Sequence, residues 1–385
     1  MTRYIDQFVR NDTERERVKI AEELAARFAQ RAERHDREGS FPFENFADLK
    51  EAGCLKLTVP AEFGGEAISL YELVQFQERL AYGDGATALA VGWHLGQVFH
   101  FGATGKWQRP LFAELCESVV RDGTMINTFA SEAATGSPSR GGRPETVAVR
   151  TDGGWKLTGR KTFSTLSPIL DRFVVTAYIP EEGAASEFLV RQSERVRLVE
   201  TWDTIGMRAT GSHDVVLEEA FVADGDRIEG KGIDDGGGWL LHIPACYMGI
   251  ALAARDYALH YARTYQPNYL DKPISSLPAV QQTIGEMEAE LRIARTMLYA
   301  AADRWDRESE NRPGLRPELG LAKYTVTNHA IRIVDKAMRI VGGASLSRSC
   351  PLERYYRDVR AGLHNPPMDS TVIQNLATTA LEDLV

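Results

Sequence analysis

Hydrophobic positions change their spacing twice along the chain. In residues 1–122, apolar side chains recur every three to four positions, as from Val18 to Phe28, which predicts amphipathic helices. Short runs rich in Val, Ile, Phe and Thr replace this spacing in residues 123–230, and long helical runs return in residues 231–385. The pattern predicts an α+β chain with an N-terminal α-helical domain, a central β domain and a C-terminal helical bundle, divided at these positions.

The central domain is expected to be a small antiparallel barrel or sandwich of six to eight strands. Asp152-Gly153 lies between two alternating segments, and Asp-Gly in that setting is typical of a hairpin turn. The sequence predicts an apolar strand beginning at Asn127 and further strands at 146–150, 155–158, 173–179, 187–190, 196–199 and 213–217.

Helices are predicted on both sides of the β domain. The four before it are expected at 14–38, 43–53, 70–80 and 86–101. The four after it begin at Pro244, Pro278, Pro317 and Asp369, and proline suits the first turn of a helix. Four long helices with turn-like connections predict a four-helix bundle.

Composition narrows the possible partners. The 385 residues carry a formal net charge of −9 with basic and acidic residues interspersed, which argues against nucleic acid as the main partner. The four cysteines are far apart and form no CxxC pair, so no metal site is expected. The most apolar run, 239–254, is too short to span a bilayer. These features predict a cytoplasmic protein that acts on a small molecule without nucleic acid or membrane.

Several short motifs, far apart in the sequence, follow one another along the chain. They are Ala130-Ser131-Glu132 with Gly136-Ser137, Gly159-x-Lys161-x-Phe163-Ser164-Thr165, Gly206-Met207-Arg208 followed by Ser212, Arg263, Gln281 with Glu286-Met287, Gly342-Gly343, and Arg357-Asp358. This ordered set resembles the acyl-CoA dehydrogenase superfamily over nearly the whole chain. The resemblance implies that superfamily's fold, a flavin whose ring lies against the β domain, and a homotetramer.

The residue types suit a flavin bed. Hydroxyl groups can hydrogen-bond the ring edge, and Phe163 offers an aromatic face for stacking. The residues expected to bind the cofactor are Thr128, Ser131, Ser137, Phe163, Thr165, Arg263, Arg339, Gly342 and Gly343. If each residue is considered without the other motifs, Phe163 is predicted to lie in the barrel core and the hydroxyl residues to be ordinary turn residues.

The phosphate end of the cofactor departs from the family pattern. The resemblance implies that an arginine, matched by Arg263, and a Gln-x-x-Gly-Gly segment of a neighbouring subunit hold the pyrophosphate. Arg339 stands at the glutamine position. A charged, bidentate donor there would suit a phosphate, so FAD is favoured over FMN, although Arg339 also suits a solvated helix end.

The catalytic base of the dehydrogenases is missing. Dehydrogenation of an acyl thioester needs a base for the α proton, and the resemblance implies a glutamate about eight residues after Arg-Asp or at the start of the bundle's first helix. Pro366 and Trp239 occupy these two positions, and Leu240 replaces a CoA-associated arginine. Asp369 is the nearest spare carboxylate, and it is also suited to capping the last helix.

The chain resembles instead the flavin-dependent monooxygenase branch, the dibenzothiophene monooxygenase group. Leu363-His364-Asn365-Pro366 is similar to a Leu-His-Asp-Pro segment of that group, and Trp93-His94 stands where it has another histidine. The resemblance implies His364, His94 and Thr165 as catalytic residues and Phe99, Phe129 and Trp202 as the substrate pocket. The alternatives are that His94 and His364 are ordinary structural histidines and that Trp202 only packs.

Three functions follow, in order of preference. The first is a two-component monooxygenase that takes reduced flavin from a separate flavin reductase and oxygenates a small sulfur- or nitrogen-containing substrate through a C4a-peroxyflavin. The second is an acyl-CoA dehydrogenase with a displaced base. The third is a non-catalytic flavin-binding protein.

Overall fold

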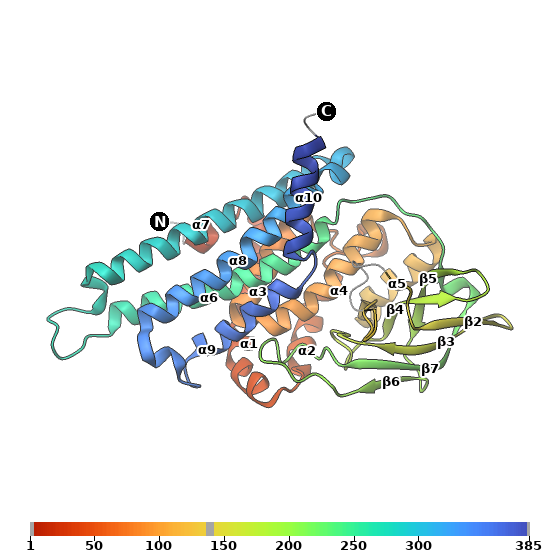
Figure 1. The fold of residues 1–385 in the computed structure, drawn as a ribbon, viewed down its shortest axis with the longest axis horizontal. Coiled ribbons are helices and arrows are strands. Elements are labelled where there is room, and N and C mark those ends of the chain that lie inside the picture. The colour runs from red at the N-terminus through yellow and green to blue at the C-terminus, as the bar shows by residue number, and fades with distance from the viewer. Residues whose placement is uncertain (1–3, 136–141, 383–385) are drawn as a thin grey trace.

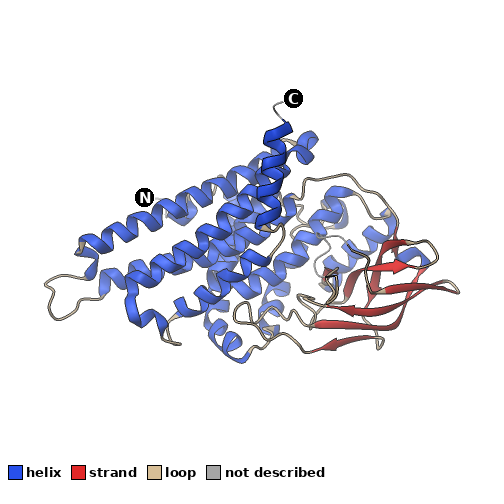
Figure 2. Ribbon diagram, viewed as in Figure 1, coloured by secondary structure: helices blue, strands red, loops and turns tan. Residues whose placement is uncertain are grey.

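The computed structural model describes residues 4–135 and 142–382. Helices run side by side through most of the molecule, and the strands gather at one end (Figure 1). Figure 2 shows the same division, with the β-sheet beside the helices α4 and α5 rather than within the bundle. The predicted order of a helical part, a β part and a second helical part is confirmed.

The helices of the N-terminal part end at well-defined caps. They are α1 Asp12–Glu38, α2 Phe43–Glu51, α3 Leu70–Gly83, α4 Gly85–Thr104 and α5 Arg109–Asp122. The Ser69 side chain accepts from the amide of Glu72 and the Glu72 side chain accepts from the amide of Ser69, which forms a capping box. The Asp84 side chain caps α4 by accepting from the amides of Ala86 and Thr87. The first four helices confirm the prediction, whereas α5 had not been predicted.

One hydrogen-bonded sheet contains all the strands of the described residues. They are β1 Ile126–Phe129, β2 Val147–Thr151, β3 Gly154–Lys161, β4 Arg172–Ile179, β5 Ala184–Arg191, β6 Val196–Val199, β7 Asp214–Ala223 and β8 Arg227–Ile228. The order is β6-β7-β3-β2-β4-β5-β8, with β1 beside β4. The predicted Asp152-Gly153 hairpin joins β2 to β3, with Gly153 at a φ of 69°.

The sheet departs from the predicted antiparallel barrel or sandwich in one respect. Its pairs are mainly antiparallel, but β1 runs parallel to β4, and β2 makes one parallel pairing with β4. Strand direction depends on how the chain enters the sheet, and the alternation of side chains does not encode it.

The C-terminal part consists of long helices. They are α6 His242–Thr264, α7 Pro278–Arg307, α8 Arg316–Val341, α9 Pro351–Asp358 and α10 Asp369–Glu382. The three longest lie side by side, and α3 packs along α6 from the N-terminal part (Figure 1). The predicted fourth helix, α10, contacts α8, whereas α3 packs along α6 and also contacts α7, so α3 is the fourth helix of the main packing. No helix of the described residues is long and apolar enough to cross a membrane.

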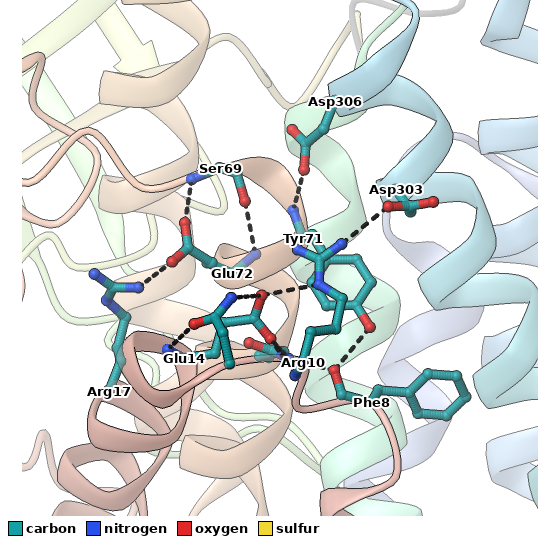
Figure 3. A network of polar contacts seen from close by, with 11 residues as sticks. Phe8, Arg10, Glu14, Arg17, Ser69, Tyr71, Glu72, Asp303 and Asp306 are labelled. Atoms are coloured by element: carbon teal, nitrogen blue, oxygen red, sulfur yellow. Dashed lines mark hydrogen bonds and ion pairs between the residues drawn. The ribbon is translucent and has the colours of Figure 1, made fainter.

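A polar network joins the start of the chain to the bundle (Figure 3). Arg10 Nε lies 2.8 Å from Glu14 Oε1, and its Nη1 lies 2.9 Å from Asp303 Oδ1. The guanidinium group also covers the ring of Tyr71, whose backbone amide donates to Asp306 Oδ2 at 2.9 Å. Side chains from α1, α3 and α7 therefore hold the N-terminal part against the bundle.

Candidate functional site

Two segments of the β domain form the base of the candidate site. The segment after β1 carries Ser131, and the segment after β3 carries Phe163 and Thr165. The amide of Thr162 donates to the carbonyl oxygen of Ser131 at 2.9 Å, which ties the two segments together. The structure therefore brings Ser131, Phe163 and Thr165 into one region, as the sequence predicted.

A buried ion pair lies behind these segments. Lys161 Nζ is 2.5 Å from Glu132 Oε1, and neither side chain is exposed. Burial alone would raise the pKa of Glu132, but hydrogen bonds from Lys161, Thr146 and the amide of Glu145 hold that pKa below its usual value. The charged pair is thus compensated on both sides, since Lys161 also donates to the carbonyl of Thr176 at 2.7 Å.

Phe163 is held in an unusual conformation at the surface. Its backbone φ is 54°, in the left-handed region that a bulky residue rarely adopts, and its side chain is 69% exposed. Its ring lies 5.9 Å from that of Trp202 in an edge-to-face arrangement. An exposed aromatic ring on a strained backbone fits a residue that stacks against a flat cofactor, and it does not fit barrel core.

Trp202 is fixed by its own hydrogen bonds. Its indole Nε1 donates to the carbonyl of Met207 at 3.0 Å, and its backbone amide donates to His213 Nδ1 at 3.0 Å. Met207 is fixed in turn, because its amide donates to Asp358 Oδ1 at 2.6 Å. Burial raises the pKa of Asp358 to about 7. The motif residues Met207 and Asp358, 151 positions apart, thus form one support for the Trp202 side of the site.

Hydroxyl groups line the other side of the site. Thr165 Oγ1 lies 2.9 Å from Ser212 Oγ, which lies 2.8 Å from Thr210 Oγ1. On β1, Thr128 Oγ1 donates to Gln97 Oε1 of α4 at 2.9 Å. Thr128 in β1 and Thr165 in the segment after β3, both predicted cofactor residues, therefore take part in ordered polar contacts.

His94 does not reach the site as a free imidazole. Its Nε2 donates to the carbonyl of Leu55 at 2.9 Å, and its Nδ1 accepts from the amide of Ile126 at 3.2 Å. The side chain is completely buried, which lowers the pKa of His94 to about 4. Both nitrogens are occupied, so the geometry contradicts the predicted catalytic role and fits a structural histidine.

His364 is placed differently. It is the last residue of a short 3₁₀ helix, Val359–His364, and it is exposed. Within the described residues no hydrogen bond is made by its ring, whereas the next residue, Asn365, accepts from the hydroxyl of Tyr247. Its imidazole is therefore available to a ligand.

Asp369 is occupied at both oxygens. Oδ1 accepts from Lys323 Nζ at 3.0 Å, and Oδ2 accepts from Asn328 Nδ2 at 2.9 Å. Trp239 stacks on His242, with ring centroids 5.8 Å apart and an interplanar angle of 18°. Asp369 thus anchors the first turn of α10 to α8, and the Trp239 position is filled by an aromatic stack.

The predicted substrate pocket is only partly assembled. Trp202 lies at the site, but Phe129 is 1% exposed and packs 5.2 Å from Phe173 within the core of the sheet. Phe99 packs 5.3 Å from Trp305 of α7. Within the described residues neither ring makes an aromatic contact with Trp202, so a pocket formed by Phe99, Phe129 and Trp202 stays a prediction.

The remaining cofactor residues lie at the opposite end of the molecule. Arg263 is in the last turn of α6, and Arg339, Gly342 and Gly343 are at the end of α8, all exposed. These helix ends point away from the sheet (Figure 1). They do not join Phe163 within one chain, in line with the resemblance, which placed the glycine segment on a neighbouring subunit. Ser137 lies outside the described residues.

The β-sheet at one end of the helices thus carries an exposed aromatic ring, Phe163, and ordered hydroxyl groups beside it. Family models for the acyl-CoA dehydrogenase N-terminal, middle and C-terminal domains match residues 11–108, 127–220 and 241–363. The chain belongs to the acyl-CoA dehydrogenase family. The predicted superfamily and the predicted flavin cofactor are confirmed, and the protein is a flavin-dependent enzyme.

The relatives of this chain include proteins named as acyl-CoA dehydrogenases and proteins named as amino sugar nitrososynthases. Putative acyl-CoA dehydrogenase YdbM of Bacillus subtilis is 49% identical over 97% of this chain and 99% of its own length. Amino sugar nitrososynthase DnmZ of Streptomyces peucetius is 31% identical over 88% of this chain and 85% of its own length. A solved structure of KijD3 in complex with FMN and dTDP-3-amino-2,3,6-trideoxy-4-keto-3-methyl-D-glucose has a TM-score of 0.84 at 25% identity, covering 97% of this chain and 94% of that chain.

Several residues of the site were missed from sequence. Gln97 and Thr210 had no predicted role, and Asp358 was noted only as part of a motif. The segment Thr210-Gly211-Ser212 offered a signal, because two hydroxyl residues flank a glycine shortly after Gly-Met-Arg. Their connection to Thr165 depends on how that segment lies beside the end of β3, which only the folded chain reveals.

Proposed function

We propose that this flavoprotein is the oxygenase component of a two-component monooxygenase. It takes reduced flavin from a separate reductase and adds one oxygen atom from O2 to a sulfur or nitrogen atom of a small substrate. The main support is the identity of the residues at the two positions where the dehydrogenases carry their catalytic glutamate. Within the described residues, Pro366 and Trp239 stand there, and Asp369 is held by Lys323 and Asn328.

The chain's own residues suit such a reaction. The bound flavin would supply the activation of O2. With flavin bound against Phe163, the edge-to-face pair of Phe163 and Trp202 would shield one side of the site from water and so limit loss of the activated oxygen as hydrogen peroxide. His364 is exposed and unpartnered within the described residues, so it can hold or donate a proton next to the bound substrate. His94 takes no part in this scheme.

Relatives support oxygenation of nitrogen as one form of the reaction. DnmZ is named an amino sugar nitrososynthase, and making a nitroso group from an amine requires oxygen to be added to nitrogen. KijD3 was solved with FMN and an amino sugar nucleotide. A substrate panel for this protein should therefore contain amines as well as sulfides and thiols.

The test uses the reduced flavoprotein and isotopically labelled O2. Mixed with each member of the panel, it is expected to place one labelled oxygen atom in at least one product. Release of hydrogen peroxide alone with every amine, sulfide and thiol would contradict the proposal. A reductase with NADH or NADPH is needed for repeated turnover, because no pyridine-nucleotide motif was found in the sequence.

The second candidate is an acyl-CoA dehydrogenase, which the name of YdbM favours. Oxidised protein mixed anaerobically with acyl-CoA thioesters of several chain lengths distinguishes the two. Under our proposal the flavin stays oxidised, because no base removes the α proton. Rapid loss of the oxidised-flavin absorbance would favour the acyl-CoA dehydrogenase function over the monooxygenase function.

We further propose that a second copy of the chain completes the cofactor site and that the assembly is a homotetramer. Arg263 and Arg339 lie in the last turns of α6 and α8, and these helix ends point away from the sheet (Figure 1). Two arginines at the end of a neighbouring bundle would pair with a pyrophosphate, which supports FAD. Size determination of the flavin-bound protein tests this, and a flavin-bound monomer would contradict it.

A further inference from the structure

Three hydroxyl groups form a row that ends beside the proposed flavin bed. Thr210 Oγ1 lies 3.0 Å from the carbonyl oxygen of Met207 and 2.8 Å from Ser212 Oγ. Ser212 Oγ lies 2.9 Å from Thr165 Oγ1. Thr210 is 1% exposed and Ser212 is 4% exposed, so solvent water does not replace these partners.

The row has a direction, because each hydroxyl has one hydrogen to donate. The carbonyl of Met207 can only accept, so Thr210 donates its hydrogen there. Thr210 must then accept from Ser212, and Ser212 must accept from Thr165. All three contacts are satisfied only in this order, and the hydrogen of Thr165 points back into the protein.

The far end of the row is firmly held. Met207 donates its amide to Asp358 at 2.6 Å, and its carbonyl also accepts from the indole of Trp202 at 3.0 Å. Reversing the row would leave Thr210 unable to donate to Met207 and so would lose one of the three bonds. A buried hydrogen bond contributes about 1 kcal/mol, so the direction inferred from the donor count is favoured about fivefold or more.

We infer that this row makes Thr165 a hydrogen-bond acceptor toward the flavin and thereby selects the reduced cofactor. The N5 atom of oxidised flavin carries only a lone pair and needs a donor. The N5 atom of reduced flavin carries a hydrogen and needs an acceptor, which Thr165 offers with its outward lone pair. The inference rests on the proposed function, in which the enzyme receives reduced flavin and the ring edge faces Thr165.

The test compares the affinities for reduced and oxidised flavin, both measured without substrate under anaerobic conditions. Wild-type protein is expected to bind the reduced form more tightly. Ser212→Ala frees the hydrogen of Thr165 to point outward, so the ratio of the two dissociation constants is expected to move by about tenfold toward the oxidised form. The midpoint potential of the bound flavin should fall by about 30 mV, which is a tenfold change for two electrons.

Two further variants distinguish a change in the ratio of flavin affinities from a general disruption of the fold. Ser167→Ala removes another buried serine hydroxyl, which donates to the carbonyl of Gly211 at 2.8 Å outside the row, and it should leave the ratio unchanged. Thr210→Val interrupts the row one step further back and should move the ratio in the same direction as Ser212→Ala. Damage to the fold would weaken both flavin forms together.

An unchanged ratio in both Ser212→Ala and Thr210→Val would overturn the inference, as would wild-type protein that prefers oxidised flavin. These outcomes are independent of the labelled-oxygen experiment. If the ratio moves as expected but no substrate acquires oxygen, the row selects reduced flavin and the proposed reaction is wrong. If oxygen is transferred but the ratio is unchanged, the reaction stands and the inference fails.

Discussion

Lys161 and Glu132 form an ion pair at 2.5 Å although neither side chain has exposed surface. Glu132 belongs to the segment after β1, and Lys161 is the last residue of β3. The pair therefore fixes the two segments that carry Ser131 and Phe163 relative to each other, and it does so from inside the sheet.

Lys161→Met should strongly destabilise the protein. The methionine fills a similar volume but leaves Glu132 as an unpaired buried charge, so the free energy of unfolding is expected to fall by about 3–5 kcal/mol. Chemical denaturation checks this. Lys156→Met is the matched control on the same strand, because its contact with Glu219 is exposed and should be worth less than about 1 kcal/mol. Equal effects of the two substitutions would contradict the assigned role of the buried pair.

Stability should decrease with falling pH because of His94. Burial lowers the pKa of His94 to about 4, whereas the unfolded chain has the ordinary value near 6.5. Between these values the unfolded state binds more protons than the folded state, so stability is full above pH 6.5 and is lost as the pH falls toward 4. Buried His242, with a pKa also lowered to about 4, adds to the same slope.

Denaturation at a series of pH values measures how steeply the free energy of unfolding changes with pH. His94→Gln retains a hydrogen-bonding side chain without a titrating group, so its stability should depend less on pH in this window. A slope identical to that of the wild type would show that His94 does not titrate there.

His364→Ala should impair product formation and leave flavin binding nearly unchanged. Loss of a positioned acid or base costs about 10²–10⁴-fold in rate, and the O2 consumed should then appear as hydrogen peroxide. The measurement is the ratio of product formed to O2 consumed. His260→Ala, at an exposed position of α6, is the control. A His364→Ala protein that still converts all consumed O2 into product would remove His364 from the mechanism.

Arg263→Ala should distinguish the two flavins. The arginine is proposed to contact the phosphates of a flavin bound to a neighbouring subunit, so FAD affinity should fall by about ten- to a hundredfold. Affinity for FMN should change much less, since FMN lacks the pyrophosphate. Arg121→Ala, on the exposed surface of α5, controls for the loss of one positive charge. Unchanged FAD affinity in Arg263→Ala would contradict the assignment.

The sequence was most informative where a local pattern determines local structure. The Asp152-Gly153 turn, the strands around it and the proline-initiated helices α7 and α8 formed as predicted, whereas α6 begins two residues before the predicted Pro244. Phe163 was predicted to contact the cofactor through a resemblance rather than through its periodicity, and its exposed ring is compatible with that prediction.

The sequence was least informative where structure depends on contacts between distant segments. His94 was assigned to the site because Trp93-His94 stands where the monooxygenase group has another histidine, but its ring bonds to Leu55 and Ile126 instead. α3 replaces α10 in the main bundle because apolar stripes on several helices are equivalent until the chain is packed. The direction of the hydroxyl row is a third example, since it depends on the carbonyl of Met207.

Phe163 has a practical consequence for anyone preparing this protein. Its ring is 69% exposed, and Ile205 in the neighbouring loop is 73% exposed. Cofactor-free chains would present these apolar groups to one another in concentrated solution. Supplementing the culture and the purification buffers with flavin should therefore raise the yield of soluble, monodisperse material.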